Sequence, residues 1–146
     1  MMKKLLLIAF IIPLLVASCG SDEAYKKMPQ EVNRFITQYW PDPWVESCEE
    51  TASGGWVVIL HNGPTISFDA AEQWTSINGN GLPLGGTLLY DQLPEVLYDY
   101  LESGTYLGQV FTMSRNTREY KVELLNIRLT YDISTETVRQ ESGELR

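Results

Sequence analysis

The chain has 146 residues, and its 19 acidic residues outnumber its 11 basic residues, so that the formal net charge at pH 7 is -8. Binding to nucleic acid requires clustered lysine and arginine that displace counterions from phosphates, and the sequence contains no such cluster. The length suffices for one modest domain, or for two half-domains that share a core.

The N-terminus has the composition of an export signal. Lys3 and Lys4 give a positively charged start, an apolar run occupies residues 5–16, and small residues follow it. The run is shorter than the roughly 18 to 20 apolar residues that span a bilayer, and Pro13 interrupts it. We therefore predict a signal peptide at residues 1–18 and an exported protein.

The sequence Val16-Ala17-Ser18-Cys19 resembles a lipobox, the motif in which a cysteine receives a diacylglyceryl group before the signal peptide is cut. The alternative is an ordinary secretory signal followed by an unrelated cysteine. Several acyl chains anchor a protein stably, because each buried methylene contributes about 0.8 kcal/mol. We predict lipid attachment at Cys19, a polar tether at residues 19–27, and a membrane-anchored lipoprotein that faces the periplasm or the cell surface.

Removal of the signal peptide takes away two lysines and leaves nine basic against 19 acidic residues. Such an acidic surface favours solubility and repels phosphate backbones and anionic lipid head groups. With Cys19 acylated, Cys48 is the remaining thiol, so that no intramolecular disulfide can form. The fold must then depend on its apolar core.

Two segments, residues 28–40 and 93–103, have the apolar spacing of helices that bury one face. Each begins near a proline, Pro29 or Pro94, and proline suits the first helical turn. Gly104 is suited to end the second helix. The apolar stripes consist of Val32, Phe35, Ile36 and Tyr39 in the first segment and of Leu97, Tyr100 and Leu101 in the second.

A pair of strands follows each predicted helix. Asn62-Gly63 is a strong signal for a tight turn in the first pair. In the second pair, apolar and polar residues alternate with period two. The predicted hairpins join residues 56–60 to 65–69 and residues 120–124 to 127–132, and further strands are predicted at residues 44–49, 73–77, 109–114 and 137–140.

The segment between the two units is rich in glycine and asparagine. A phosphate-binding loop would have a lysine followed by serine or threonine after its last glycine, and this segment does not. We interpret it as a linker. The predicted organisation is a first repeat at residues 28–77, a linker at 78–92, a second repeat at 93–140 and a C-terminal tail at 141–146.

The repeated pattern resembles the PepSY-like domain of secreted bacterial lipoproteins, which is related in fold to the beta-lactamase-inhibitor-like proteins. The first repeat carries the matching residues Asn62-Gly63, Phe68-Asp69 and Trp74. The pattern departs at Glu72-Gln73, where a glycine usually precedes the tryptophan, and at Thr137, where the second repeat lacks a tryptophan. The resemblance implies an α+β fold of two tandem helix-plus-antiparallel-sheet repeats, with helices packed on one face of the sheet, and a non-catalytic role.

The residues themselves do not indicate catalysis. His61, the single histidine, is placed at a predicted turn, and its sequence neighbours do not indicate a triad. Cys48 lies near Glu46 and Glu49, whose negative charges raise the pKa of a thiol. Glu49 and Glu50 would point to opposite faces of a strand. No closely spaced metal-ligand motif appears in the sequence, and we predict no enzyme, no metal and no cofactor.

The aromatic residues carry the functional hypothesis. Trp40 and Trp44 flank Pro41-Asp42-Pro43, whose prolines would stiffen a loop and present a ring at low entropic cost. Tryptophan and tyrosine are enriched at the residues that dominate protein interfaces. We predict Trp40 and Trp44 as partner-binding residues, and packing in the core is the alternative.

Two functions follow from these expectations. The first is a lipid-anchored binding module that holds a protein or peptide on the open face of its sheet and inhibits or modulates a peptidase or another envelope protein. The second is a structural or accessory envelope lipoprotein with diffuse contacts. An exposed aromatic patch would favour the first function, and scattered apolar residues would favour the second. The sequence leaves the oligomeric state open.

Overall fold

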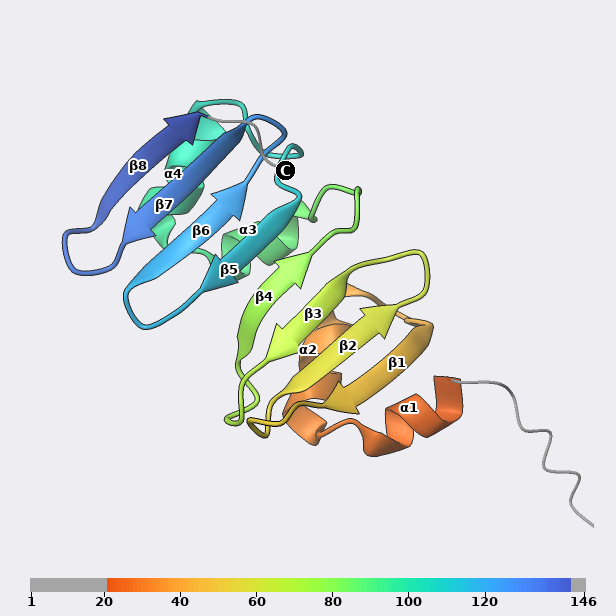
Figure 1. Ribbon diagram of the computed structural model, residues 1–146. Helices are drawn as coiled ribbons and strands as arrows, with labels where there is room; N and C mark the ends of the chain where they lie inside the picture. The colour runs from red at the N-terminus through yellow and green to blue at the C-terminus, as the bar shows by residue number, and fades with distance from the viewer. Residues whose placement is uncertain (1–20, 143–146) are drawn as a thin grey trace, which may run out of the picture.

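The computed structural model describes residues 21–142, so that the predicted signal peptide and Cys19 lie outside the described residues. The described chain runs from α1 at one edge of a sheet to β8 at the other (Figure 1). Its helices are α1 (Ser21–Lys27), α2 (Gln30–Tyr39), α3 (Gly86–Gln92) and α4 (Glu95–Ser103). Its strands are β1 (Val45–Glu50), β2 (Trp56–Leu60), β3 (Thr65–Phe68), β4 (Trp74–Asn78), β5 (Thr112–Arg115), β6 (Glu119–Glu123), β7 (Ile127–Asp132) and β8 (Thr137–Ser142).

The strands form one eight-stranded antiparallel sheet, in the order β1 to β8. The predicted fold class of two tandem helix-plus-sheet repeats is therefore wrong. Pairing of β4 with β5 joins the two halves, with Ile77 opposite Met113, and the helices, of seven to ten residues, are a minor part of the structure. Two separate sheets would have exposed unpaired backbone at β4 and β5, and the pairing of these strands removes both edges.

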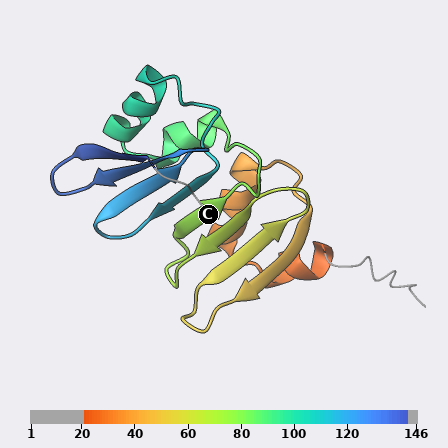
Figure 2. The ribbon, with the colours of Figure 1, turned by 45° about the horizontal axis from the view of Figure 1, so that its top comes forward.

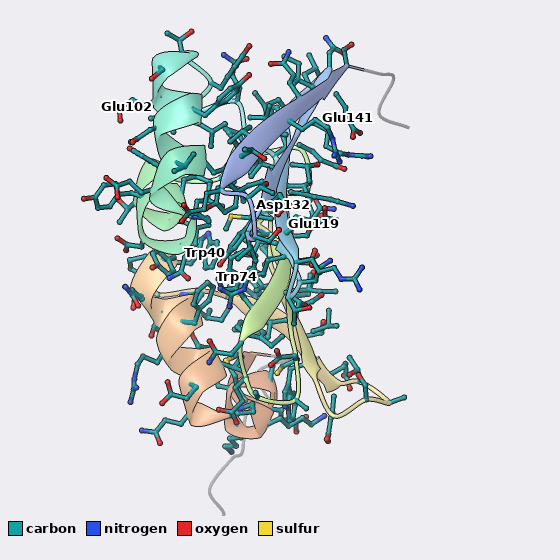
Figure 3. The ribbon with its side chains drawn as sticks, turned by 90° about the vertical axis from the view of Figure 1, so that its left-hand side faces the viewer. Trp40, Trp74, Glu102, Glu119, Asp132 and Glu141 are labelled. Carbon is teal, nitrogen blue, oxygen red and sulfur yellow. The ribbon has the colours of Figure 1, made fainter. Side chains whose placement is uncertain are left out.

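Within residues 21–142, α2, α3 and α4 lie on one face of the sheet, and the opposite face is uncovered (Figures 2 and 3). The core lies between the helices and the sheet. One residue from each of the first seven strands faces the helices in a continuous row, and the row consists of Cys48, Val58, Ile66, Ile77, Met113, Val122 and Leu129, all buried.

Helices α2 and α4 lie within the two segments that the apolar spacing predicts as helical. Val32 and Ile36 of α2 and Leu97 and Leu101 of α4 are completely buried. These residues are four apart, so that each pair lies on one side of its helix and faces the core. The hairpins β2–β3 and β6–β7 also lie where the alternating patterns predict them.

The segment predicted as a polar tether is helical from Ser21 to Lys27. Ala24 of this helix and Met28, which directly follows it, are buried in the core. The hydroxyl of Tyr25 donates a hydrogen bond of 3.0 Å to the backbone carbonyl of Pro43. Helix α1 therefore packs along β1, at one edge of the sheet (Figure 1).

The segment predicted as a linker contains α3, in which Leu88 and Leu89 are buried. These two leucines directly follow the glycine-rich part of the segment. Their burial stabilises a short helix, although the composition of the segment indicates a loop. The last strand, β8, continues to Ser142 and so includes the first residues of the predicted tail. In the part of the chain that the structure describes, no helix is long and apolar enough to cross a membrane.

Candidate functional site

The uncovered face of the sheet carries short hydroxyl side chains on its middle strands. The register places Ser67, Ser76 and Ser114 side by side on β3, β4 and β5. The same row continues through Val57 and Glu49 toward β1, and through Lys121, Thr130 and Arg139 toward β8. The middle of this face therefore carries small polar side chains, and charged residues lie toward both ends of the row.

Trp44 lies at the end of this face, directly before β1. Val45 and Leu60 are paired and buried in the core, so that alternation turns the neighbouring side chains of Trp44 and His61 toward the uncovered face. The backbone N–H of His61 donates a hydrogen bond of 2.8 Å to the carbonyl of Trp44. Their rings stack with centroids 4.5 Å apart, and Trp44 remains 58% exposed.

Glu46 completes this cluster because β1 contains an irregularity. The register shifts between Val45 and Ser47, as in a β-bulge, and the extra residue is Glu46. Its Oε1 atom lies 3.6 Å from Nδ1 of His61. The carboxylate thus forms an ion pair with the imidazole when the ring is protonated, and the ring in turn supports one side of Trp44.

An open hollow of about 380 Å³ lies beside Glu46, between the β2–β3 turn and the loop after β4. The side-chain amide of Asn80 holds these two segments together, because it donates hydrogen bonds to the carbonyl of Gly63 at 2.9 Å and to Oγ1 of Thr65 at 3.0 Å. The hollow is lined by Glu46, Ile59, Leu60, Asn62, Gly63, Asn80 and Leu82. We call this hollow, together with Trp44 and His61, the Trp44 corner.

The Trp44 corner combines groups that suit the binding of an extended polypeptide. The exposed indole and Leu82, which is 56% exposed, offer apolar surface for a side chain. The carboxylate of Glu46 and the amide of Asn62 can form hydrogen bonds with a partner's backbone or polar side chains. Rigid aromatic rings surrounded by polar groups are typical of the residues that dominate protein interfaces.

Trp40, the second predicted partner-binding residue, lies elsewhere. It directly follows α2, is half-buried, and packs against Phe35 and Tyr39 with ring centroids 6.4 and 6.1 Å apart. Figure 3 shows it on the helix side of the sheet. The structure thus places Trp40 within the helical layer and Trp44 on the uncovered face, and partner binding by either residue stays a prediction.

A polar network at the junction of the two halves has no counterpart in the sequence patterns. The indole N–H of Trp74 donates to Oε1 of Gln92 at 2.9 Å, and Nε2 of Gln92 donates to the hydroxyl of Tyr39 at 2.7 Å. That hydroxyl donates to Oδ2 of Asp91 at 3.0 Å. The guanidinium of Arg115 lies 4.0 Å above the Trp74 ring, and its Nε donates to the Trp74 carbonyl at 2.7 Å.

This network connects α2, α3, β4 and β5, and its members are far apart in the sequence. Burial is the main cause that raises the pKa of the Tyr39 phenol, so that the hydroxyl keeps its proton as a donor at neutral pH. The sequence patterns point to Trp74 and to Tyr39 as separate packing residues and do not connect them. Gln92 and Arg115 carry no local signal, because their roles depend on contacts with residues 18 and 41 positions away.

Cys48 lies in β1 and points into the core. Burial raises the pKa of its thiol, the charge of Glu49 raises it further, and Lys27 acts in the opposite direction. The thiol is therefore protonated at neutral pH. Among residues 21–142, no three or more His, Cys, Asp or Glu side chains gather closely enough to hold a metal ion.

The sequence matches no protein-family model and no curated protein. Solved structures of three bacterial proteins share its fold. A candidate periplasmic protein of the DUF2874 family from Bacteroides vulgatus ATCC 8482 is 20% identical, with a TM-score of 0.68 over 80% of this chain and 92% of that chain. A candidate calcium-regulated periplasmic protein from Bacteroides thetaiotaomicron is 21% identical, with a TM-score of 0.68 over 84% of this chain and 100% of that chain.

The third structure is a candidate periplasmic protein of unknown function from Bacteroides vulgatus ATCC 8482. It is 15% identical, with a TM-score of 0.63 over 80% of this chain and 94% of that chain. At these identities the likeness shows a common fold. The eight-stranded sheet with helices on one face is thus an arrangement that other bacterial proteins also adopt.

Proposed function

We propose that the protein is an extracytoplasmic binding module, anchored through a lipid on Cys19, that holds an extended segment of an envelope protein at the Trp44 corner. The observation that carries this proposal is the exposed indole of Trp44. The ring packs against His61, and Glu46, which lies 3.6 Å from His61, lines an open hollow. An aromatic ring that is fixed by its neighbours loses little conformational entropy when a partner covers it.

Export is supported by two independent observations. Residues 1–18 have the charge, length and apolar run of a signal peptide. The three proteins of similar fold are themselves described as candidate periplasmic proteins. The lipobox-like sequence before Cys19 supports the finer proposal that the exported protein stays attached to a membrane.

We also propose that the chain is a PepSY-like domain that acts by binding and carries out no catalysis of its own. The residues Asn62-Gly63, Phe68-Asp69 and Trp74 support this relationship. In this reading the module modulates a peptidase or another envelope protein by covering part of its surface. The protonated, buried thiol of Cys48 supports a non-catalytic role, because the thiolate is the reactive form of cysteine.

Site-specific photo-crosslinking in cells tests the binding surface. Trp44 of the full-length, lipid-modified chain is replaced by p-benzoyl-phenylalanine, and a matched variant carries the same group at Tyr90, which is 68% exposed on α3. We expect a discrete protein adduct from position 44 that is absent from position 90. Identical adducts from both positions, or none from position 44, would contradict the proposal.

The anchor is tested by acyl labelling of the full-length chain. We expect incorporation of labelled fatty acid that is lost in Cys19→Ser and kept in Cys48→Ser, together with processing that is sensitive to globomycin. Release of the unmodified protein in soluble form would overturn the lipid anchor. Because this readout is independent of partner capture, the two parts of the proposal can fail separately.

A further inference from the structure

The two edge strands of the sheet differ in how they are protected. Helix α1 packs along β1, where Ala24 and Met28 are buried and Tyr25 bonds to Pro43. On the other side, no described strand pairs with the outer edge of β8. Five of the six residues of β8 are exposed. An uncovered edge strand presents unpaired backbone N–H and C=O groups, on which another strand can add.

Strand β8 is nevertheless paired and packed on its inner side. Its residues from Thr137 to Ser142 pair continuously with β7. The hydroxyl of Tyr100 on α4 donates a hydrogen bond of 2.9 Å to Oε1 of Gln140, and Val138 packs against the core. The edge is therefore held in the extended shape that strand addition requires.

The charges on β8 are complementary to a second copy of the same strand. Arg139 and Glu141 both point to the uncovered face, and Figure 3 shows Glu141 on the side of the sheet away from the helices. Within one copy, Nε of Arg139 donates a hydrogen bond of 3.2 Å to Oε1 of Glu141, so that a second copy would extend this ion pair into a network of four charges. When two copies of β8 pair antiparallel about a two-fold axis through Gln140, Arg139 of each copy lies opposite Glu141 of the other. Opposite charges directly across an antiparallel pair are stabilising, and like charges are destabilising.

The alternatives next to this register are unfavourable. A shift that centres the pair on Arg139 places two arginines opposite each other, and a shift that centres it on Glu141 places two glutamates opposite each other. A shift by one residue would place the helix-facing side chains of one copy opposite residues of the other copy that point to the uncovered face. The alternation of Arg139, Gln140 and Glu141 thus favours the register centred on Gln140, in which opposite charges face each other.

We propose that the protein forms a two-fold symmetric dimer through antiparallel pairing of β8 with β8 of a second copy, centred on Gln140. The two sheets then join into one continuous sheet. Because α1 covers β1, the edge that would continue the assembly is closed, so that pairing stops at two copies. A head-to-tail arrangement of exposed edges would instead grow into open fibres.

Sedimentation velocity over a range of concentrations tests the proposal on residues 20–146, which contain all the described elements. We expect a concentration-dependent dimer. In Glu141→Arg, arginines face each other in both contacts, and we expect the dissociation constant to rise by about tenfold or more. The double variant Arg139→Glu with Glu141→Arg restores opposite charges and should restore dimerisation, which also shows that the single variant had not failed by misfolding.

A matched control is Glu49→Arg, the same charge change on the exposed surface of the other edge strand, β1. It should leave the dimer unchanged. A monomer at all concentrations would overturn the proposal. The edge of β8 would then be open to pairing with a strand of another protein. Equal effects of Glu49→Arg and Glu141→Arg would overturn it as well, because a general charge effect would then explain the result.

Disulfide trapping tests the register. Directly opposite residues of an antiparallel pair have Cα atoms about 4.5 to 5.5 Å apart, which is within the range for a disulfide. In a Cys48→Ser background, Gln140→Cys should form a covalent dimer under mild oxidation, whereas Thr137→Cys, which lies three residues from the axis, should not. Trapping through Thr137→Cys and not through Gln140→Cys would overturn the assigned register.

Discussion

The indole nitrogen of Trp74 and the side-chain oxygen of Gln92 lie 2.9 Å apart, in a hydrogen bond that joins β4 to the last residue of α3. The amide of Gln92 also donates to Tyr39 of α2. One glutamine therefore connects three elements near the place where β4 pairs with β5. Because Trp74 is only 3% exposed, its N–H has little access to water as an alternative partner.

Replacement of Gln92 by alanine should leave the buried indole N–H of Trp74 without its acceptor. An unsatisfied buried polar group costs about 1–3 kcal/mol, and we expect a loss of this size in the free energy of unfolding. Urea denaturation measures it. Gln109→Ala removes an amide from an exposed loop and should cost less than about 0.5 kcal/mol. Similar losses for both variants would show that the network contributes little.

Trp44→Ala should change stability by about 1 kcal/mol or less, because more than half of the indole is exposed. Ile66→Ala, at a completely buried position, should cost about 2–5 kcal/mol. Thermal unfolding of the two variants provides the comparison. A loss in Trp44→Ala as large as that in Ile66→Ala would assign Trp44 to the core and remove the basis for the Trp44 corner as a binding surface.

Cys48 should react slowly with thiol reagents in the folded protein. Burial raises the pKa of the thiol, so that the reactive thiolate is scarce up to mildly alkaline pH, and access is blocked as well. In residues 20–146 Cys48 is the single thiol, and absorbance with Ellman's reagent follows it directly. We expect rapid reaction in urea and slow reaction in buffer. Equally fast reaction in both would refute the burial of Cys48 in β1.

Asp132 should stabilise the β7–β8 turn at neutral pH. Its Oδ1 accepts hydrogen bonds from the hydroxyl and backbone N–H of Ser134 and from the backbone N–H of Thr135. These bonds, that of the Ser134 hydroxyl above all, lower the pKa of the carboxyl. The folded pKa then lies below the unfolded value, so that the stabilisation is present above that value and is lost as the pH falls through the folded pKa.

We therefore expect Asp132→Ala to unfold at a lower temperature than the parent protein at pH 7. The difference should shrink as the pH falls below about 4, the usual pKa of an aspartate in unfolded chains. Thermal unfolding between pH 7 and pH 2 measures this dependence. Asp99→Ala, on the exposed surface of α4, serves as the control. A constant difference for Asp132→Ala across this range would exclude the proposed role of its charge.

The elements of the fold could be predicted where a local period exists. The apolar spacing of residues 28–40 and 93–103 locates α2 and α4, and the Asn62-Gly63 turn locates the hairpin β2–β3. The pairing of β4 with β5 could not be predicted in this way. Its partners Ile77 and Met113 are 36 positions apart, and alternation shows that a strand has a buried face without showing which strand lies beside it.

The candidate site could be predicted in part for the same reason. Prolines around Trp44 indicate a stiff, exposed loop, and His61 is placed at a turn. The stacking of these two rings depends on the register between β1 and β2, including the irregularity at Glu46, which has no signal in the sequence. Helix α1 was not predicted because residues 21–27 are mostly polar, and the burial of Ala24 depends on packing along β1, which a local pattern does not show.

Helix α1 changes how far the module can reach. Residues 21–27, which were predicted as part of a polar tether, are helical and pack along β1. Seven residues span about 10 Å as a helix and about 24 Å when fully extended. The lipid anchor that we propose at Cys19 would therefore hold the folded domain nearer to a membrane than an extended tether would, and would favour partners close to the bilayer.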